Sequence, residues 1–236
     1  ADIKTVTALN GFAMTAITAL TAQNTEGVFD IHNVPASLVA EQIKVVLRDI
    51  GANVIKIGML SNPEIIKVVS DTLTEVAPEL PIIVDPVMVA KGGASLLEEE
   101  AIDALKTLII PRAKVLTPNI PEAEALTGMV APRVEDAENL ALALSALGPQ
   151  AILLKGGHRG GDYVVDLLME RGRVLETYTS DRINTVHTHG TGCTLSSAVA
   201  AGLAQGQTLA HSVKRAREYV LEAIRTAPCY GRGHGP

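Results

Sequence analysis

A short glycine-rich segment in front of an apolar helix carries the clearest chemical signal in the sequence. Gly190, Thr191 and Gly192 lead into Cys193, and the residues that follow have the apolar spacing of a helix. Glycines let the backbone approach a ligand closely, and the free N–H groups at a helix start attract anions such as phosphate oxygens. The segment is neither a P-loop, which needs Gly-Lys-Ser/Thr, nor a dinucleotide fingerprint, which would follow the first strand. Taken alone, it fits an anion-binding loop and a simple capped turn equally well.

Cys193 falls in the first turn of that predicted helix. A helix N-terminus lowers the pKa of a thiol from its usual value of about 8.5, so we expect a thiolate that can accept a hydroxyl proton. General-base help of this kind contributes about 10² to 10⁴ in rate. The alternative is a small buried apolar residue, which is what a free cysteine most often is. Its place inside the glycine turn favours the chemical role, whereas Cys229, next to Pro228, is interpreted as a small apolar residue.

Polar residues also follow the predicted strands. In an open parallel sheet, ligands bind outside the carboxyl ends of the strands, so these residues are expected on one rim. The strands end in Gln23-Asn24, Gly58-Met59, Asp85-Pro86, Pro118-Asn119 and Lys155-Gly156-Gly157.

Four of these rim residues have more than one interpretation. Asn119 and Glu122 lie one helical turn apart and suit Mg²⁺ held through water beside a triphosphate, but a helix N-cap with its capping-box partner explains them at least as well. Asp85 ends an apolar strand, where a carboxylate needs a partner or a metal. Lys155 is expected to pair with nucleotide phosphates, or else simply to extend its side chain to solvent.

The elements that position these residues alternate between strand and helix, which predicts a parallel sheet with right-handed crossovers. The sequence predicts an α/β fold over residues 1–236 as a single domain. Two further strands are expected around Arg171-Gly172, as an antiparallel edge. The predicted strands are 12–23, 53–58, 81–84, 114–117 and 151–154, and the predicted helices are 1–9, 35–50, 62–76, 98–110, 134–147, 191–204 and 208–227.

Composition narrows the class of protein. Of the 236 residues, 47% are apolar and only 3% aromatic, which is the mixture expected for helices flanking a buried sheet. The formal net charge is -6, and no basic stripe is present, so nucleic acid is an unexpected partner. Two distant cysteines and the lack of a leader or long apolar run indicate a cytoplasmic protein without membrane contact.

At this point the sequence resembles the hydroxymethylpyrimidine and phosphomethylpyrimidine kinases of thiamine biosynthesis, members of the ribokinase-like superfamily. The resemblance runs almost from end to end. It is carried by the segments 1–5, 14–25, 57–60, 85–93, 116–128, 153–158, 188–197 and 231–236.

The resemblance implies a three-layer α/β/α sandwich with a mostly parallel sheet, ATP and Mg²⁺ as cofactors, a pyrimidine alcohol as substrate, and a homodimer. It also implies roles for individual residues. Asp2, Gln23, Met59 and Val87 would bind the pyrimidine, Gly190, Thr191, Gly192 and Cys193 would form the transition-state loop, Lys155, Asn119 and Thr188 would serve the nucleotide, and Glu122 and Asp85 would serve the metal.

The sequence departs from the family pattern in two places. The family begins with a strand and a Gly-Ser-Asp segment before the helix that starts here at Ala1. This chain lacks both, so we expect it to be part of a longer protein that contains them. Val186-His187 stand where the family often has Lys-Asn, which weakens an expected contact to phosphate.

Two alternative functions stay open. One is a pyridoxal kinase, which uses the same loop and a similar ring with a hydroxymethyl group. The other is a non-catalytic pyrimidine-binding protein, in which replacing Cys193 by Ala would leave ligand binding nearly unchanged.

Overall fold

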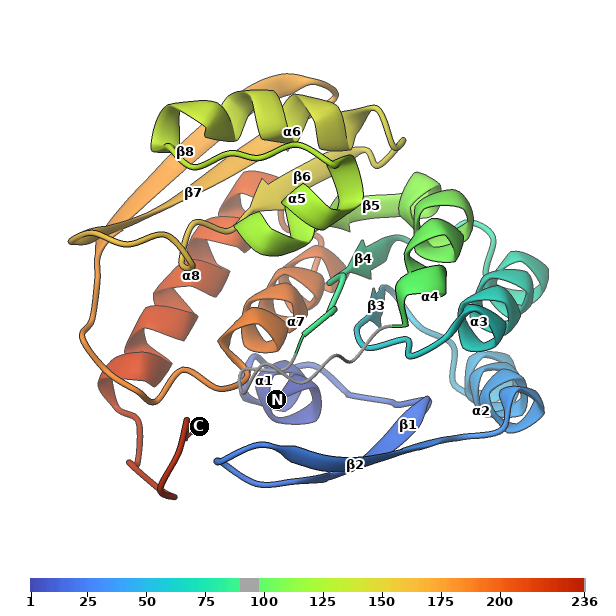
Figure 1. The fold of residues 1–236 in the computed structure, drawn as a ribbon. Helices are drawn as coiled ribbons and strands as arrows, with labels where there is room; N and C mark the ends of the chain where they lie inside the picture. Colours follow the sequence, from blue (N-terminus) through green and yellow to red (C-terminus); the bar gives the residue numbers. More distant parts are fainter. Residues whose placement is uncertain (90–97, 236) are drawn as a thin grey trace.

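The computed structural model describes residues 1–89 and 98–235, so the end of the 85–93 motif lies outside the described residues. Its centre is a six-stranded sheet in the order β3-β4-β5-β6-β7-β8, in which β3 to β6 are parallel and the last two strands are antiparallel. Figure 1 shows this sheet between two layers of helices. The strands are β3 (Ile55–Ile57), β4 (Ile82–Val84), β5 (Ala113–Leu116), β6 (Ala151–Leu154), β7 (Tyr163–Glu170) and β8 (Arg173–Asp181).

Alternating apolar residues explain the layers, because neighbouring residues of a strand point to opposite faces. Val84 packs on one face with helices α2 to α6, whereas Ile83 packs on the other with α7 and α8. The three-layer α/β architecture predicted from sequence is therefore confirmed. The helices are α1 (Asp2–Ala8), α2 (Ala36–Asp49), α3 (Pro63–Val76), α4 (Glu99–Ala104), α5 (Ile120–Thr127), α6 (Ala137–Ser145), α7 (Thr191–Ala204) and α8 (Leu209–Arg225).

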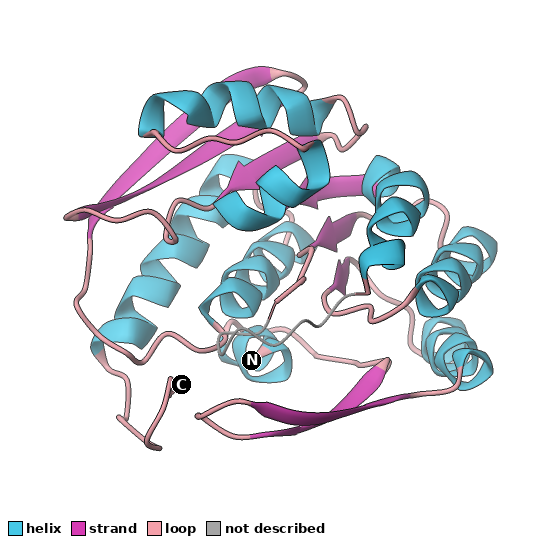
Figure 2. Cartoon of the chain, viewed as in Figure 1, coloured by secondary structure: helices cyan, strands magenta, loops and turns pink. Residues whose placement is uncertain are grey.

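A second, two-stranded sheet lies apart from the central one (Figure 2). It pairs β1 (Ala19–Gln23) antiparallel with β2 (Val28–Asn33). The prediction of one strand over 12–23 was wrong for residues 12–18, and β2 was not predicted. The Gln42 side chain accepts a hydrogen bond from Ile17 N at 2.9 Å and donates one to Ile17 O at 3.0 Å, so a helix, not a strand, satisfies that backbone.

Two predicted helices are interrupted. The helix expected over 98–110 passes from α4 into a π-helical segment, Leu105–Ile109, and then a 3-10 turn, Ile110–Arg112. Pro111 lacks a backbone N–H, so it cannot continue an α-helix there. The helix expected over 134–147 begins as a 3-10 turn, Val134–Asp136, before α6.

No helix among the described residues is both long enough and apolar enough to cross a membrane. Cys229 is exposed and has a positive φ of 58°, so its interpretation as a small packed residue was wrong.

Candidate active site

A buried ion pair lies at the carboxyl ends of the parallel strands. Lys155, directly after β6, donates to Asp85, directly after β4, with an Nζ–Oδ1 distance of 2.8 Å. Thr117, after β5, donates to the same oxygen at 3.2 Å. Burial by itself would raise the pKa of Asp85, but Lys155 and Lys56 more than offset this and lower it. The predicted rim therefore holds an ionised carboxylate and a charged ammonium side by side.

The glycine loop reaches this ion pair at the start of α7. Gly190 is the N-cap residue with φ 76°, a left-handed conformation that favours glycine. A Cβ on Gly192 would lie 3.3 Å from Lys155 Nζ and 3.9 Å from Asp85 Oδ2. The first N–H groups of a helix have no acceptor within the helix. Free donors and an ammonium group therefore converge on one place, as the anion-binding interpretation predicts.

The turn that carries Lys155 is fixed from outside the site. Gly156 N donates to Asp166 on β7 at 2.8 Å, and Arg217 on α8 pairs with the same carboxylate at 2.8 Å. A Cβ on Gly156 would lie 2.0 Å from the carbonyl oxygen of Val165, so only glycine fits. The Asp166–Arg217 pair was not predicted from the sequence as part of the site.

A second charge network lies beside the loop. Lys56, the middle residue of β3, donates to Asp2 Oδ1 and Oδ2 at 3.2 and 3.1 Å. Ser197 on α7 donates to Asp2 Oδ1 at 2.8 Å. Asp2 was predicted from the resemblance, but Lys56 and Ser197 were not. The interruption of the apolar strand Ile55–Ile57 by a lysine was the signal in the sequence that could have found Lys56.

Cys193 lies between these two networks, and its thiol differs from the expectation. Burial raises the pKa of the Cys193 thiol to about 11; Lys56 and Lys155 lower it, while Asp85 and Asp2 raise it. The predicted lowering by the helix N-terminus was therefore wrong, because desolvation outweighs the positive charges. At neutral pH the thiol is protonated.

Asn119 and Glu122 form a capping box at the start of α5. Asn119 accepts from Glu122 N at 2.9 Å, and Glu122 accepts from Asn119 N at 2.8 Å. This is the alternative interpretation considered from the sequence. The same residues still belong to the rim, because Asn119 forms a bridge with Lys155. Burial, together with the charge of Asp85, raises the pKa of Glu122 to about 7 although Lys155 lowers it.

The carboxylates of Glu122 and Asp85 suit a Mg²⁺ ion that takes only some of its ligands from the protein. No group of three or more His, Cys, Asp or Glu side chains among the described residues could hold a metal by itself. Mg²⁺, however, keeps several waters and uses one or two carboxylates plus substrate phosphates. Burial is the main cause of the raised pKa of Glu122, and repulsion from the buried Asp85 carboxylate adds to it. A cation beside nucleotide phosphates would relieve that repulsion, so the residues fit the ion.

Gln23 reaches the loop from the small sheet. Its Nε2 atom lies 3.3 Å from His189 Nε2, and Thr188 O accepts from the Thr191 hydroxyl at 3.0 Å. The chain end completes this contact, because His189 N donates to Gly235 O at 3.1 Å. Gln23 and Thr188 are thus both brought to the glycine loop. His189 lies within the segment 188–197 that carries the resemblance, but the contact of its ring could not be predicted from the sequence.

Met59 and Val87 follow the neighbouring strands β3 and β4 and are half-buried. Thr18 donates to Met59 O at 2.9 Å, which ties the start of the small sheet to the rim. Their role in binding the pyrimidine stays a prediction.

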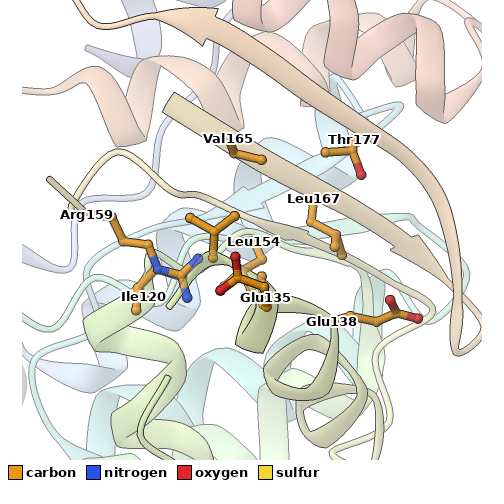
Figure 3. A pocket seen from close by; sticks show the side chains of 10 residues that line it. Ile120, Glu135, Glu138, Leu154, Arg159, Val165, Leu167 and Thr177 are labelled. Atoms are coloured by element: carbon orange, nitrogen blue, oxygen red, sulfur yellow. The ribbon is translucent and has the colours of Figure 1, made fainter. Parts of the chain in front are cut away.

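The cavity in Figure 3 lies elsewhere. Its volume is about 200 Å³, and it is lined by α5, α6, β6 and β7 on the opposite face of the sheet from α7. Ile120, Leu154 and Leu167 make its wall largely apolar, with Arg159 and Glu135 at one side. It does not include the Asp85–Lys155 pair, so we do not place the chemistry there.

Comparison with known proteins decides the family. The chain matches the family described as phosphomethylpyrimidine kinase over residues 1–236. The chain belongs to this family. A hydroxymethylpyrimidine/phosphomethylpyrimidine kinase from Bacillus subtilis is 44% identical over 100% of the chain and 87% of its own length. The bifunctional thiamine biosynthesis protein ThiED from Geobacter sulfurreducens is 47% identical, and the chain spans 48% of its length.

Solved structures agree with the fold. The phosphomethylpyrimidine kinase of Clostridium difficile superposes with a TM-score of 0.82 at 38% identity, covering 94% of this chain and 91% of that one. A Bacillus subtilis pyridoxal kinase bound to ADP gives a TM-score of 0.90 at 32% identity, covering 100% and 89%. The ribokinase-like fold and the kinase class predicted from sequence are confirmed.

Proposed function

We propose that the chain transfers the γ-phosphoryl group of ATP to the hydroxymethyl group of 4-amino-5-hydroxymethyl-2-methylpyrimidine, and then to the resulting monophosphate, in thiamine diphosphate biosynthesis. The observation that carries this proposal is the contact between the start of α7 and the Asp85–Lys155 pair, where Gly192 leaves room beside the ammonium group. Family membership supplies the substrate class.

In-line transfer needs the acceptor oxygen and the γ-phosphorus aligned, and most of the catalysis in such reactions comes from positioning and charge stabilisation. The N–H groups of Gly192 and Cys193 and the Lys155 ammonium receive the negative oxygens of the migrating group. The bond from the substrate oxygen to phosphorus forms as the bond from phosphorus to ADP breaks. Gly190 and Thr191 hold the loop in shape through the αL turn and the hydroxyl contact to Thr188.

Mg²⁺, when bound with the nucleotide, neutralises charge on its phosphates. Glu122 and Asp85 would hold it, through water where needed. Asn119 and Thr188 would face the nucleotide from the two sides of the rim.

The pyrimidine ring is assigned to Asp2, Gln23, Met59 and Val87. These come from α1, the small sheet and the ends of β3 and β4, so the ring would lie between the glycine loop and the hairpin. The thiolate form of Cys193, a very small fraction at neutral pH, takes the hydroxyl proton. Because its thiol pKa is about 11, this step contributes more as the pH rises.

A pyridoxal kinase is the second candidate. The observation that favours it is the similarity to a Staphylococcus aureus pyridoxal kinase in complex with pyridoxal, with a TM-score of 0.88 at 30% identity, covering 100% of this chain and 85% of that one. A competition assay with both alcohols discriminates. The pyrimidine should be phosphorylated with the higher kcat/KM.

Residues 1–236 are further proposed to form one kinase domain in a cytoplasmic homodimer that binds neither nucleic acid nor membrane. The single sheet shared by both apolar clusters supports the one-domain assignment. Apolar side chains exposed on the small sheet support self-association.

A coupled ATPase assay with the pyrimidine alcohol tests the proposed function. Turnover that depends on the alcohol is the expected result. Binding of the alcohol without turnover, unchanged by Cys193→Ala, would instead support the non-catalytic alternative.

A further inference from the structure

Lys56 is a buried lysine in the middle of a short parallel strand. Its side chain is only 10% exposed, and its neighbours Ile55 and Ile57 pack into the core. Lysines are almost never buried to this extent without a partner. Its position therefore needs a reason beyond the stability of β3.

The partner of Lys56 is the carboxylate of Asp2. The Lys56 ammonium donates to both carboxylate oxygens, and the Ser197 hydroxyl donates to one of them at 2.8 Å. These donors come from β3 and α7, so Asp2 is held from two elements at once. The Asp2 side chain is still 46% exposed, which leaves it free to meet a ligand.

The sequence also makes room for the ammonium group. A Cβ on Gly58 would lie 2.8 Å from Lys56 Nζ, closer than real Cβ contacts come. Gly58 has no positive φ that would itself require glycine. A side chain at position 58 would therefore force the Lys56 head group to shift.

The same network is connected to the reacting loop. Ser197 follows Cys193 by one helical turn, so both side chains lie on the same face of α7. A group that fixes Asp2 against Ser197 also fixes its distance from the thiol.

We propose that Lys56 is a positioning residue, which orients the Asp2 carboxylate for the ring of the pyrimidine alcohol beside the glycine loop. This inference rests on the proposed function, because that function assigns Asp2 to the ring. Lys56 acts on the ring through Asp2, and its charge also lowers the pKa values of Asp85 and of the Cys193 thiol.

The test compares Lys56→Met with the wild-type chain in steady-state kinetics. The KM for the pyrimidine alcohol should rise about ten- to a hundredfold, the range for loss of a charge-assisted hydrogen bond, while the KM for ATP stays within about twofold. Removing one partner of an ion pair destabilises a protein most when the remaining charge is buried. The Asp2 side chain is 46% exposed and stays solvated, so the variant should fold. The matched control is Lys67→Met, which removes an exposed lysine paired with Asp71 and should leave both KM values unchanged.

Gly58→Ala provides a second variant that keeps the charge. The added methyl group displaces the ammonium from Asp2, so it should raise the KM for the alcohol in the same way. The inference is overturned if the KM for the alcohol is unchanged in folded Lys56→Met, or if the KM for ATP rises equally.

Wild-type measurements separate this inference from the proposed function. An inactive wild-type chain would count against the proposed function. Calorimetric binding of the pyrimidine alcohol to the wild type and to Lys56→Met would then still decide the role of Lys56: equal affinity overturns it, and weaker binding by the variant supports it.

Discussion

At the scale of single residues, the site depends on how buried charges compensate one another. Lys155 keeps a raised pKa despite burial, because Asp85 and Glu122 stabilise its charged form. Asp85, only 2% exposed, stays ionised for the corresponding reason. A permanent positive charge is therefore available beside the first turn of α7, where the transferred group would carry negative charge.

Gly192→Ala tests this arrangement directly. The new methyl group would lie 3.3 Å from Lys155 Nζ and would occupy the space assigned to phosphate oxygens. We expect kcat/KM to fall about 10² to 10³-fold, as when one donor to a transition-state oxyanion is lost, with little change in the melting temperature. Gly160→Ala, where an added Cβ meets nothing within 4 Å, is the control. Equal activity of the two variants would contradict the assignment.

The raised pKa of Cys193 predicts an unreactive thiol at neutral pH. Because the pKa is about 11, the thiolate fraction is very small at pH 7 and grows as the pH rises. Iodoacetamide should therefore modify the exposed Cys229 first, and Cys193 only at high pH, as read by peptide mass spectrometry. The kcat/KM of the wild type should likewise increase above pH 8, and that of Cys193→Ser should not. Rapid alkylation of Cys193 at pH 7 would show that its pKa is not raised.

At the scale of elements, the chain end connects the small sheet to the glycine loop. Gly233 N donates to Thr25 Oγ1 at 3.3 Å, and Gly235 O accepts from His189 N. A Cβ on Gly233 would lie 2.1 Å from Thr25 O. Segments far apart in the sequence thus meet where Gln23 contacts His189, as the position of the C-terminus in Figure 1 allows.

Gly233→Ala should loosen this junction. Overpacking of a close contact costs about 1–3 kcal/mol, so we expect the C-terminal segment to separate from the hairpin turn. Hydrogen exchange of residues 24–27 should speed up, and the KM for the pyrimidine alcohol should rise. Gly27→Ala, in the same turn but with nothing within 4 Å of the added Cβ, should change neither. Unaltered hydrogen exchange in Gly233→Ala would show that the C-terminal segment does not hold the hairpin turn.

Elements with one buried face could be predicted from the sequence, and those without one could not. The strands β4 to β6 are short apolar runs buried on both faces, and α3 shows its buried stripe at helical spacing. In contrast, β2 is largely exposed, so its residues lack the alternation that marks a strand. At the site, Asn119 and Glu122 could not be assigned, because a capping box and a metal site need the same residue types. The Lys56–Asp2 pair joins residues distant in sequence and needed the fold.

At the scale of the whole molecule, the small sheet exposes apolar side chains that no packing within the described residues of one chain covers. Phe29 on β2 is 70% exposed, and Leu20 on the paired strand β1 is exposed as well. A two-stranded sheet is only marginally stable in water unless a hydrophobic face is covered. The proposed homodimer would cover these side chains with a second copy.

Analytical ultracentrifugation, which measures the mass of the sedimenting species, tests this prediction. The wild-type chain should sediment at twice its mass of 24.8 kDa, and a variant with Phe29→Ser and Leu20→Ser should shift towards the monomer. Val130→Ser, at another exposed apolar residue outside the small sheet, is the control and should leave the mass unchanged. A monomeric wild type, or a double variant that stays dimeric, would rule out this surface.

The proposed reaction is phosphoryl transfer to a hydroxymethyl group at the start of α7. Mass spectrometry of the products formed from ATP, Mg²⁺ and each alcohol measures it most directly. The pyrimidine alcohol should gain one phosphoryl group, and its monophosphate a second, and both products should form about 10² to 10³-fold more slowly with Gly192→Ala. Unmodified pyrimidine after incubation with the folded wild-type chain, or products that persist at the same rate in Gly192→Ala, would contradict it.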